Sequence, residues 1–199
     1  MRRFRSGIGV DINPAALAVA YDRLQLGTQR TLNGNSIPPY KDRMGLERAV
    51  ADTKQRLYLG DARNLDLVED NSVGLIATHP PYVNIIGYTS ENEVQGDISL
   101  VKDVDSFCRE MYLVAKECFR VLRTGGYCCI LIGDTRRRTY YVNISDRVLV
   151  EFLRAGFALK ESVVKRQWNC TATGFWWKKS IKENFLLIMH ENLYVMRKM

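Results

Sequence analysis

Along this chain, segments with the hydrophobic pattern of β-strands alternate with segments that have the pattern of helices. Short apolar or alternating runs predict β-strands over residues 8–12, 56–59, 73–78, 127–132, 157–166 and 193–197. Helices are predicted over residues 15–26, 44–54, 104–123 and 146–154, most clearly over 104–123, where apolar residues recur at helical spacing. Because strands and helices alternate, we expect an open, mostly parallel α/β sheet with helices on both faces.

Cap and turn residues mark where these elements end. Asn13 and Pro14 suit the N-cap and the first turn of the first helix. The glycines at 125 and 126 are expected to stop the long helix, Ser145 to cap the next helix and Gly156 to end it.

Composition narrows the class of protein. The 199 residues are 46% hydrophobic and 26% charged, with a formal net charge of +7, which is typical of one globular domain. Basic side chains prevail over 1–56 and 106–199, whereas acidic side chains prevail over 57–105. A basic excess favours a polyanionic partner only weakly, because a charge run is often a solvated face. No apolar run approaches the ~18–20 residues of a membrane span, so we expect a cytoplasmic protein without membrane contact.

The cysteines and histidines indicate neither a disulfide framework nor a metal site. Five cysteines include no C-x-x-C pair, and the adjacent Cys128 and Cys129 would point to opposite faces of a strand. Only two histidines are available as zinc ligands. We therefore expect reduced thiols and no bound metal.

Acidic residues end two of the predicted strands, where ligands of α/β sheets bind. Asp11 could accept hydrogen bonds from the two hydroxyls of a ribose. It could instead cap the following helix, but Asn13 already occupies the cap position. Asp61 could bind the amino edge of an adenine, although a Gly-Asp pair after a strand is equally common in ordinary turns.

The segment His79-Pro80-Pro81-Tyr82 follows the strand over 73–78. Two prolines fix φ and remove two N–H donors, so the preceding carbonyls are held as rigid acceptors. A planar base could place its exocyclic amino group between the Pro80 carbonyl and the His79 side chain while Tyr82 stacks on its face. A rigid turn with a buried tyrosine is the alternative for such a short motif.

Taken together, these segments resemble a known family. The chain is similar to the S-adenosylmethionine-dependent DNA methyltransferases that modify amino groups, the adenine-N6 and cytosine-N4 family. The similar segments occur in the family's order at 9–14, 59–62, 78–82, 120–126, 133–136 and 185–198. The resemblance implies a Rossmann-like methyltransferase fold with an antiparallel C-terminal strand, formed by a single catalytic domain over 1–199.

The resemblance also implies residue roles. His79, Pro80, Pro81 and Tyr82 would form the catalytic loop, and the S-adenosylmethionine site would include Asp11, Ile12, Asp61, Ala62 and His79. The family usually has Asp, Asn or Ser where this chain has His79. A neutral imidazole can still accept a hydrogen bond from an amino group, but the replacement leaves adenine or cytosine open as the target.

The implied activity is direct methyl transfer to a base flipped out of double-stranded DNA, as in restriction–modification. Methylation of an RNA base such as one in tRNA, or a remnant that only binds nucleic acid, are the alternatives. Residues expected to contact nucleic acid, rather than to be ordinary solvated or core side chains, are Tyr88, Arg136, Arg137, Arg138, Trp168, Lys178 and Lys179.

One element of the family pattern is missing. The family has a central strand that ends in a glycine-rich turn just before the position of Ile8, and only seven residues precede Ile8 here. We therefore expect an N-terminally truncated domain that binds S-adenosylmethionine poorly alone. A partner chain that supplies the missing strand is the alternative.

Overall fold

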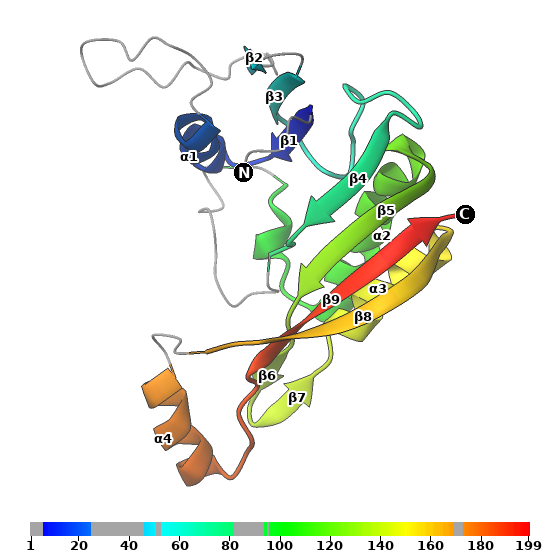
Figure 1. The fold of residues 1–199 in the computed structure, drawn as a ribbon. Coiled ribbons are helices and arrows are strands. Elements are labelled where there is room, and N and C mark those ends of the chain that lie inside the picture. Colours follow the sequence, from blue (N-terminus) through cyan, green and yellow to red (C-terminus); the bar gives the residue numbers. More distant parts are fainter. Residues whose placement is uncertain (1–5, 25–45, 51–52, 82–93, 95, 169–172) are drawn as a thin grey trace, which may run out of the picture. The chain divides into compact units, whose positions relative to one another are not determined.

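The computed structural model describes residues 6–24, 46–50, 53–81, 94, 96–168 and 173–199. The chain divides into two compact units. The first unit comprises Met1–Leu65 with Thr89–Asp97, and the second comprises Asp66–Tyr88 with Ile98–Met199. Figure 1 shows the helices and strands of both units with their labels.

The first unit is a small sheet with the strand order β1-β3-β2 and one helix. Strand β1 (Gly7–Asp11) pairs in parallel with β3 (Thr53–Leu59), and helix α1 (Pro14–Leu24) follows β1. The Asn13 side chain accepts a hydrogen bond from the Ala15 N–H at 2.9 Å, which confirms its role as the cap. Leu17 of α1 and Leu57 of β3 are buried together and form a small core.

The predicted helix over 44–54 is wrong. Residues Leu46–Val50 form strand β2, which pairs antiparallel with β3 in a register that joins Leu46 to Leu57 and Val50 to Thr53. Helix propensity is a weak bias over so few residues, and the backbone hydrogen bonds that β3 offers outweigh it.

The second unit holds a larger sheet with the order β4-β5-β9-β8. Its strands are β4 (Val73–Thr78), β5 (Leu122–Ile132), β8 (Phe157–Arg166) and β9 (His190–Lys198). Strands β4 and β5 are parallel, whereas β9 runs antiparallel to β5 and β8. The α/β class and the antiparallel C-terminal strand are confirmed, but parallel pairing between the described strands is limited to β1 with β3 and β4 with β5.

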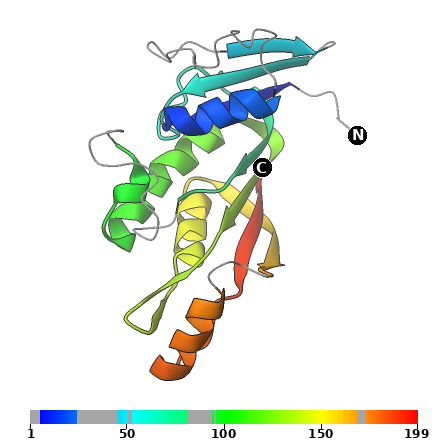
Figure 2. The same ribbon diagram turned by 90° about the vertical axis from the view of Figure 1, so that its left-hand side faces the viewer.

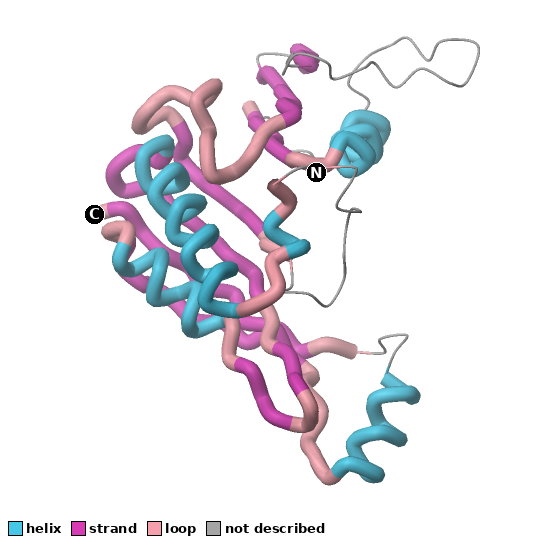
Figure 3. Tube along the Cα trace, turned by 180° about the vertical axis from the view of Figure 1, so that it is seen from behind, coloured by secondary structure: helices cyan, strands magenta, loops and turns pink. Residues whose placement is uncertain are grey.

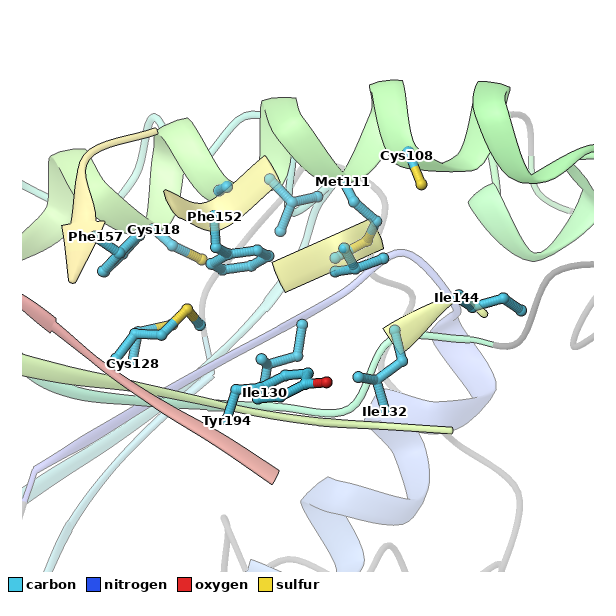
Figure 4. Packing of buried hydrophobic residues seen from close by; sticks show 14 of the residues in the cluster. Cys108, Met111, Cys118, Cys128, Ile130, Ile132, Ile144, Phe152, Phe157 and Tyr194 are labelled. Atoms are coloured by element: carbon cyan, nitrogen blue, oxygen red, sulfur yellow. The ribbon is translucent and has the colours of Figure 1, made fainter. Parts of the chain in front are cut away.

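Helices α2 (Val104–Val121) and α3 (Ser145–Arg154) cover one face of this sheet, as Figure 3 shows from behind. The buried stripe of α2 and the buried residues of α3 pack on alternate residues of β5 and β9 (Figure 4). Fully buried side chains of this core include Phe107, Met111, Phe152, Ile130 and Met196. Each such burial stabilises the fold by roughly 1.5–3 kcal/mol, so this layer holds the ends of the strands in place.

Two of the expected element ends differ from the structure. Gly125 does not stop a helix but lies inside β5 with φ +78°, where the pairing with β4 shifts register between Val73 and Leu75. Ser145 does not cap α3, because it is the first helical residue and no side chain of the N-cap position bonds to the helix. Gly156 follows α3 with φ +113°, as expected for a glycine that ends a helix.

Several further elements extend this unit. A 3₁₀ turn spans Ile98–Leu100, and a hairpin joins β6 (Thr135–Arg137) to β7 (Tyr140–Val142). Helix α4 (Thr173–Glu183) lies away from the sheet, beyond the end of β8, in both Figure 1 and Figure 2.

The cysteines with described placement carry free thiols, as predicted. Cys108, Cys118 and Cys128 are buried, Cys129 is half-buried, and Cys170 lies outside the described residues. Burial raises the pKa of the Cys108 and Cys129 thiols, so both stay protonated at neutral pH. Within the described ranges, no helix is long and apolar enough to cross a membrane.

Candidate functional site

The first group of candidate residues lies at the carboxyl ends of β1 and β3. Asp11 is the last residue of β1, and its carbonyl accepts the Gly60 N–H at 3.0 Å, which joins the two strand ends. The Asp11 Oδ1 atom accepts the Asn13 N–H at 2.8 Å. Loss of water around Asp11 raises its pKa, the backbone N–H of Asn13 opposes this, and the nearby negative Asp97 adds to the rise. A carboxylate in this setting favours a ligand that donates hydrogen bonds.

Asp61 is held by the arginine two residues farther along. Its Oδ1 accepts the Arg63 backbone N–H at 2.8 Å, and its Oδ2 accepts the guanidinium Nε at 2.9 Å and Nη2 at 2.5 Å. Burial alone would raise the pKa of Asp61, but the hydrogen bonds from Arg63 outweigh it and lower the pKa. An adenine that contacts Asp61, as predicted, would therefore have to share this carboxylate with Arg63. The sequence did not indicate Arg63 as a partner of Asp61.

The predicted catalytic loop begins at the carboxyl end of β4 in the second unit. Pro80 is buried and Pro81 half-buried, whereas the His79 side chain is 46% exposed. The two prolines thus anchor the loop while the imidazole stays accessible. Tyr82 and Tyr88 lie outside the described residues, so their predicted roles at the base stay predictions.

Two charged residues that sequence reasoning missed lie beside His79. The Nε2 atom of His79 is 3.4 Å from Oε1 of Glu191, whose side chain is only 5% exposed. The Oε2 atom of Glu191 accepts a hydrogen bond from Lys165 Nζ at 2.6 Å. Lys165 and Glu191 are paired across β8 and β9. Only that register brings them together, and the sequence does not reveal it.

Asp134 follows β5 and fixes the neighbouring helix. Its Oδ1 accepts the N–H groups of Ile144 and Ser145 at 2.7 and 2.8 Å, and its Oδ2 accepts the hydroxyls of Ser145 and Tyr141. This carboxylate therefore does the capping that was expected of Ser145.

The three arginines predicted to contact nucleic acid have different surroundings. Arg136 donates to the carbonyls of Thr139 and Leu186 at 2.8 and 2.6 Å and stacks over the Phe185 ring. Arg137 donates to the Lys102 carbonyl at 2.9 Å, and Arg138 is exposed at the hairpin turn with φ +54°. Arg136 thus holds the hairpin in place, and a phosphate contact remains a prediction for all three.

Exposed aromatic and basic side chains gather on and before α4. Trp168 is 77% exposed, with the Arg166 guanidinium 5.1 Å from its ring centre. Lys178 is exposed, and Lys179 lies 5.2 Å from the Trp176 ring centre and within 4.0 Å of Glu183. Phe175, Trp176 and Trp177 are also exposed on this helix. The structure leaves these rings accessible, as stacking on bases would require.

The residues of the first unit fit the nucleoside part of S-adenosylmethionine. Asp11 offers a fixed, partly desolvated carboxylate to ribose hydroxyls, and the Ile12 side chain reaches toward Gly96. Gly96 has φ +87°, and a Cβ there would lie 2.9 Å from the Arg63 guanidinium. Ala62 is exposed beside Asp61. An acceptor at a strand end followed by an apolar side chain is compatible with a bound adenosine.

Comparison with characterised proteins points in one direction. No family model matches the chain. It is 30% identical to the type II methyltransferase M.MjaI of Methanocaldococcus jannaschii over a stretch that covers 43% of this chain and 35% of M.MjaI. It is also 30% identical to the type II methyltransferase M.SfiI of Streptomyces fimbriatus, over 40% of this chain and 18% of M.SfiI. The chain thus spans about a third or less of the length of these curated relatives.

Solved structures agree in fold. A putative DNA modification methylase from Thermus thermophilus, complexed with S-adenosyl-L-methionine, superposes with a TM-score of 0.50 at 25% identity and covers 70% of this chain and 53% of its own. The cytosine-N4-specific PvuII DNA methyltransferase superposes with a TM-score of 0.56 at 14% identity, over 72% of this chain and 49% of its own. The chain is therefore similar, over part of its length, to two type II methyltransferases, and it has the Rossmann-like fold of S-adenosylmethionine-dependent methyltransferases.

Proposed function

We propose that this chain carries catalytic residues of a DNA methyltransferase that moves a methyl group from S-adenosylmethionine to the N6 amino group of adenine or the N4 amino group of cytosine. The observation that carries the proposal is the loop after β4, where buried Pro80 anchors an accessible His79 at the carboxyl end of a parallel strand. The sequence likeness to two type II methyltransferases supports the same reaction.

Each part of the reaction has a candidate residue. Bound S-adenosylmethionine would supply an electrophilic methyl group on sulfur. A ring nitrogen of neutral His79 accepts one amino hydrogen of the base, which keeps the lone pair of the amino nitrogen directed outward for in-line attack. The new C–N bond forms as the C–S bond breaks with its electron pair going to sulfur, and the extra proton on the amino nitrogen leaves through His79 to water.

The proposed substrate is double-stranded DNA with the target base flipped out. Arg138 and Lys178 are exposed basic residues, and Trp168 offers an accessible ring. Lysine and arginine neutralise phosphates, and aromatic rings stack on bases without regard to sequence. These properties support a nucleic-acid partner for the second unit.

A partner chain that supplies a further strand is part of the proposal. Among the described strands, β1 pairs only with β3, and β4 pairs only with β5. Each is thus an edge strand whose outer hydrogen-bonding groups can accept another strand. We expect weak binding of S-adenosylmethionine by the 199-residue chain alone, measured by titration calorimetry, and micromolar binding without a partner would count against this role.

Transfer of a labelled methyl group tests the reaction. The chain at high S-adenosylmethionine concentration should label DNA and not tRNA. His79→Asn, which keeps an acceptor, should retain part of the activity, whereas His79→Ala should lose most of it. Labelling of tRNA alone, or equal activity in the native chain and His79→Ala, would overturn the proposal.

The pH profile is a second test of His79. A protonated imidazole is only a donor, so the methylation rate should fall once acid protonates His79. The amide of His79→Asn takes up no proton under the same conditions, so that variant should not show this loss. A parallel fall in both proteins would show that another group is responsible.

A further inference from the structure

We infer that Glu191 is a positioning residue that holds His79 as its Nε2–H tautomer, and that Lys165 offsets part of the negative charge that Glu191 presents to His79. This inference rests on the proposed function, because it assigns the His79 atom that meets the substrate. Glu191 and Lys165 would then belong to the site although neither contacts the base.

The geometry places one buried carboxylate between two more exposed cationic or titratable groups. The Glu191 side chain is 5% exposed, whereas those of His79 and Lys165 are 46% and 54% exposed. Lys165 holds Oε2 at 2.6 Å, and His79 Nε2 lies 3.4 Å from Oε1. The two carboxylate oxygens are thus directed to different partners.

The topology explains why these three residues meet. The carboxyl ends of β4 and β8 and the start of β9 lie at the same end of the sheet, because β9 runs antiparallel to its neighbours. The amide of Asn192 donates to Ser145 on the helix-covered face of the sheet. Neighbouring residues of a strand point to opposite faces, so the side chain of Glu191 points to the other face.

The tautomer follows from what a carboxylate can do. An ionised glutamate only accepts hydrogen bonds, so the imidazole nitrogen beside it is favoured when it carries the proton. With Nε2 protonated, Nδ1 keeps its lone pair and becomes the atom that can accept an amino hydrogen of the base. In the other tautomer, the Nε2 lone pair would face the carboxylate and Nδ1 could no longer accept.

Lys165 limits how strongly the Glu191 carboxylate attracts the proton on Nε2 of His79. The ammonium group lies 2.6 Å from Oε2 and offsets part of the carboxylate charge that faces the imidazole. The other charged group at this end of β8, Arg166, lies over the Trp168 ring. Removing Glu191 should consequently weaken the preference of His79 for the Nε2–H tautomer, whereas removing Lys165 should not.

Nitrogen NMR of the imidazoles tests this without any activity measurement. The chain has only two histidines, and His190→Gln assigns the His79 signals. We expect Nε2 to be the protonated nitrogen of neutral His79 in the native chain. Glu191→Gln, whose amide also donates, should mix the tautomers, whereas Lys165→Met, which leaves the carboxylate charge unopposed, should keep or raise the share of the Nε2–H tautomer.

The exposed carboxylate of Glu161 on β8 provides the matched control. Glu161→Gln removes the same charge from the same sheet and should leave the His79 signals unchanged. An Nδ1–H tautomer in the native chain, or a Glu191→Gln variant whose tautomers are distributed as in the native chain, would overturn the inference.

Activity adds a double-variant experiment. Glu191→Gln should lower kcat by about 10–100-fold, as the loss of a group that orients another typically does, with little change in KM. In the His79→Asn background, where there is no imidazole tautomer to fix, the same change should have little effect. An equally large loss in both backgrounds would contradict the positioning role.

The two sets of results separate the inference from the proposed function. If the NMR shifts occur as expected but no variant methylates DNA or RNA, the proposed function fails while the positioning of His79 stands. If DNA is methylated but Glu191→Gln changes neither the tautomer nor kcat, the positioning role fails while the proposed function stands.

Discussion

At the scale of single residues, buried charges with several partners fix the ends of β9. Lys198, its last residue, is 9% exposed and donates from Nζ to the Asn71 side chain and to the carbonyls of Phe119 and Leu122 at 2.6–2.8 Å. Glu191, near the other end, is shared by Lys165 and His79. Charged residues are rarely buried unless paired in this way.

We expect Lys198→Met to destabilise the second unit. The methionine fills most of the space but removes the ammonium donor from the Asn71 side chain and from the Phe119 and Leu122 carbonyls, which should lower the free energy of unfolding by about 2–3 kcal/mol. Urea denaturation measures this loss. Lys182→Met on the exposed side of α4 is the control and should stay within about 0.5 kcal/mol of the native chain; equal stability of the two variants would contradict the account.

Asp146 makes the folding stability of the second unit depend on pH in the acid range. Hydrogen bonds from the Tyr194 hydroxyl and the Asn143 amide outweigh desolvation and lower the pKa of Asp146 below its ordinary 3.8. A carboxyl whose pKa is lowered by folding contributes stability above its ordinary pKa, and this contribution is lost as pH falls through the lowered value. Asp146→Asn should therefore lose less stability than the native chain between about pH 5 and about pH 3 in urea unfolding. Identical pH slopes would refute this contribution.

Residue roles could be predicted only where the local sequence carries the signal. His79, Pro80 and Asp11 follow apolar strands, so their places at strand ends were predictable from the chain. Glu191 and Lys165 were not predictable, because their contact depends on the antiparallel register of β8 and β9. The Arg63 contact with Asp61 depends on side-chain geometry that a turn sequence does not reveal.

At the scale of elements, hydrophobic periodicity predicted the helices and strands whose structure does not depend on pairing with a distant segment. The bounds of β4 and β8 match the predicted strands, and the apolar stripe of α2 faces the core as expected. Strand β2 was mistaken for a helix because its structure comes from pairing with β3. Helix α4 was not predicted, since its rings and lysines show no single buried face and it carries only one buried residue, Ser180, among those described.

The start of α3 depends on Asp134 rather than on its own sequence. Asp134→Ala removes the acceptor of two backbone N–H groups and of two hydroxyls. The loss should lower the free energy of unfolding by about 1–2 kcal/mol, as for other helix caps. Asp134→Asn keeps one acceptor oxygen and should lose less. Thermal unfolding followed by circular dichroism gives both values, and an unchanged Asp134→Ala variant would rule out this cap.

At the scale of the whole molecule, the chain consists of two units that each contain one parallel pair of strands. The candidate cofactor residues Asp11 and Asp61 belong to the first unit, and His79 with Glu191 belongs to the second. The resemblance of motif order predicted Asp11, Asp61 and His79 as site residues, but not Glu191. The sequence did not predict the division into units, because the hydrophobic patterns of β1 and β4 are those expected of strands in one sheet.

The chemical identity of the product tests the central claim most directly. Unmethylated DNA incubated with the chain and saturating S-adenosylmethionine would be digested to nucleosides and analysed by mass spectrometry, with His79→Ala as the control. We predict N6-methyladenine or N4-methylcytosine, strongly reduced in the control. The appearance of 5-methylcytosine instead, or of no methylated nucleoside at any cofactor concentration, would contradict an amino-directed methyltransferase.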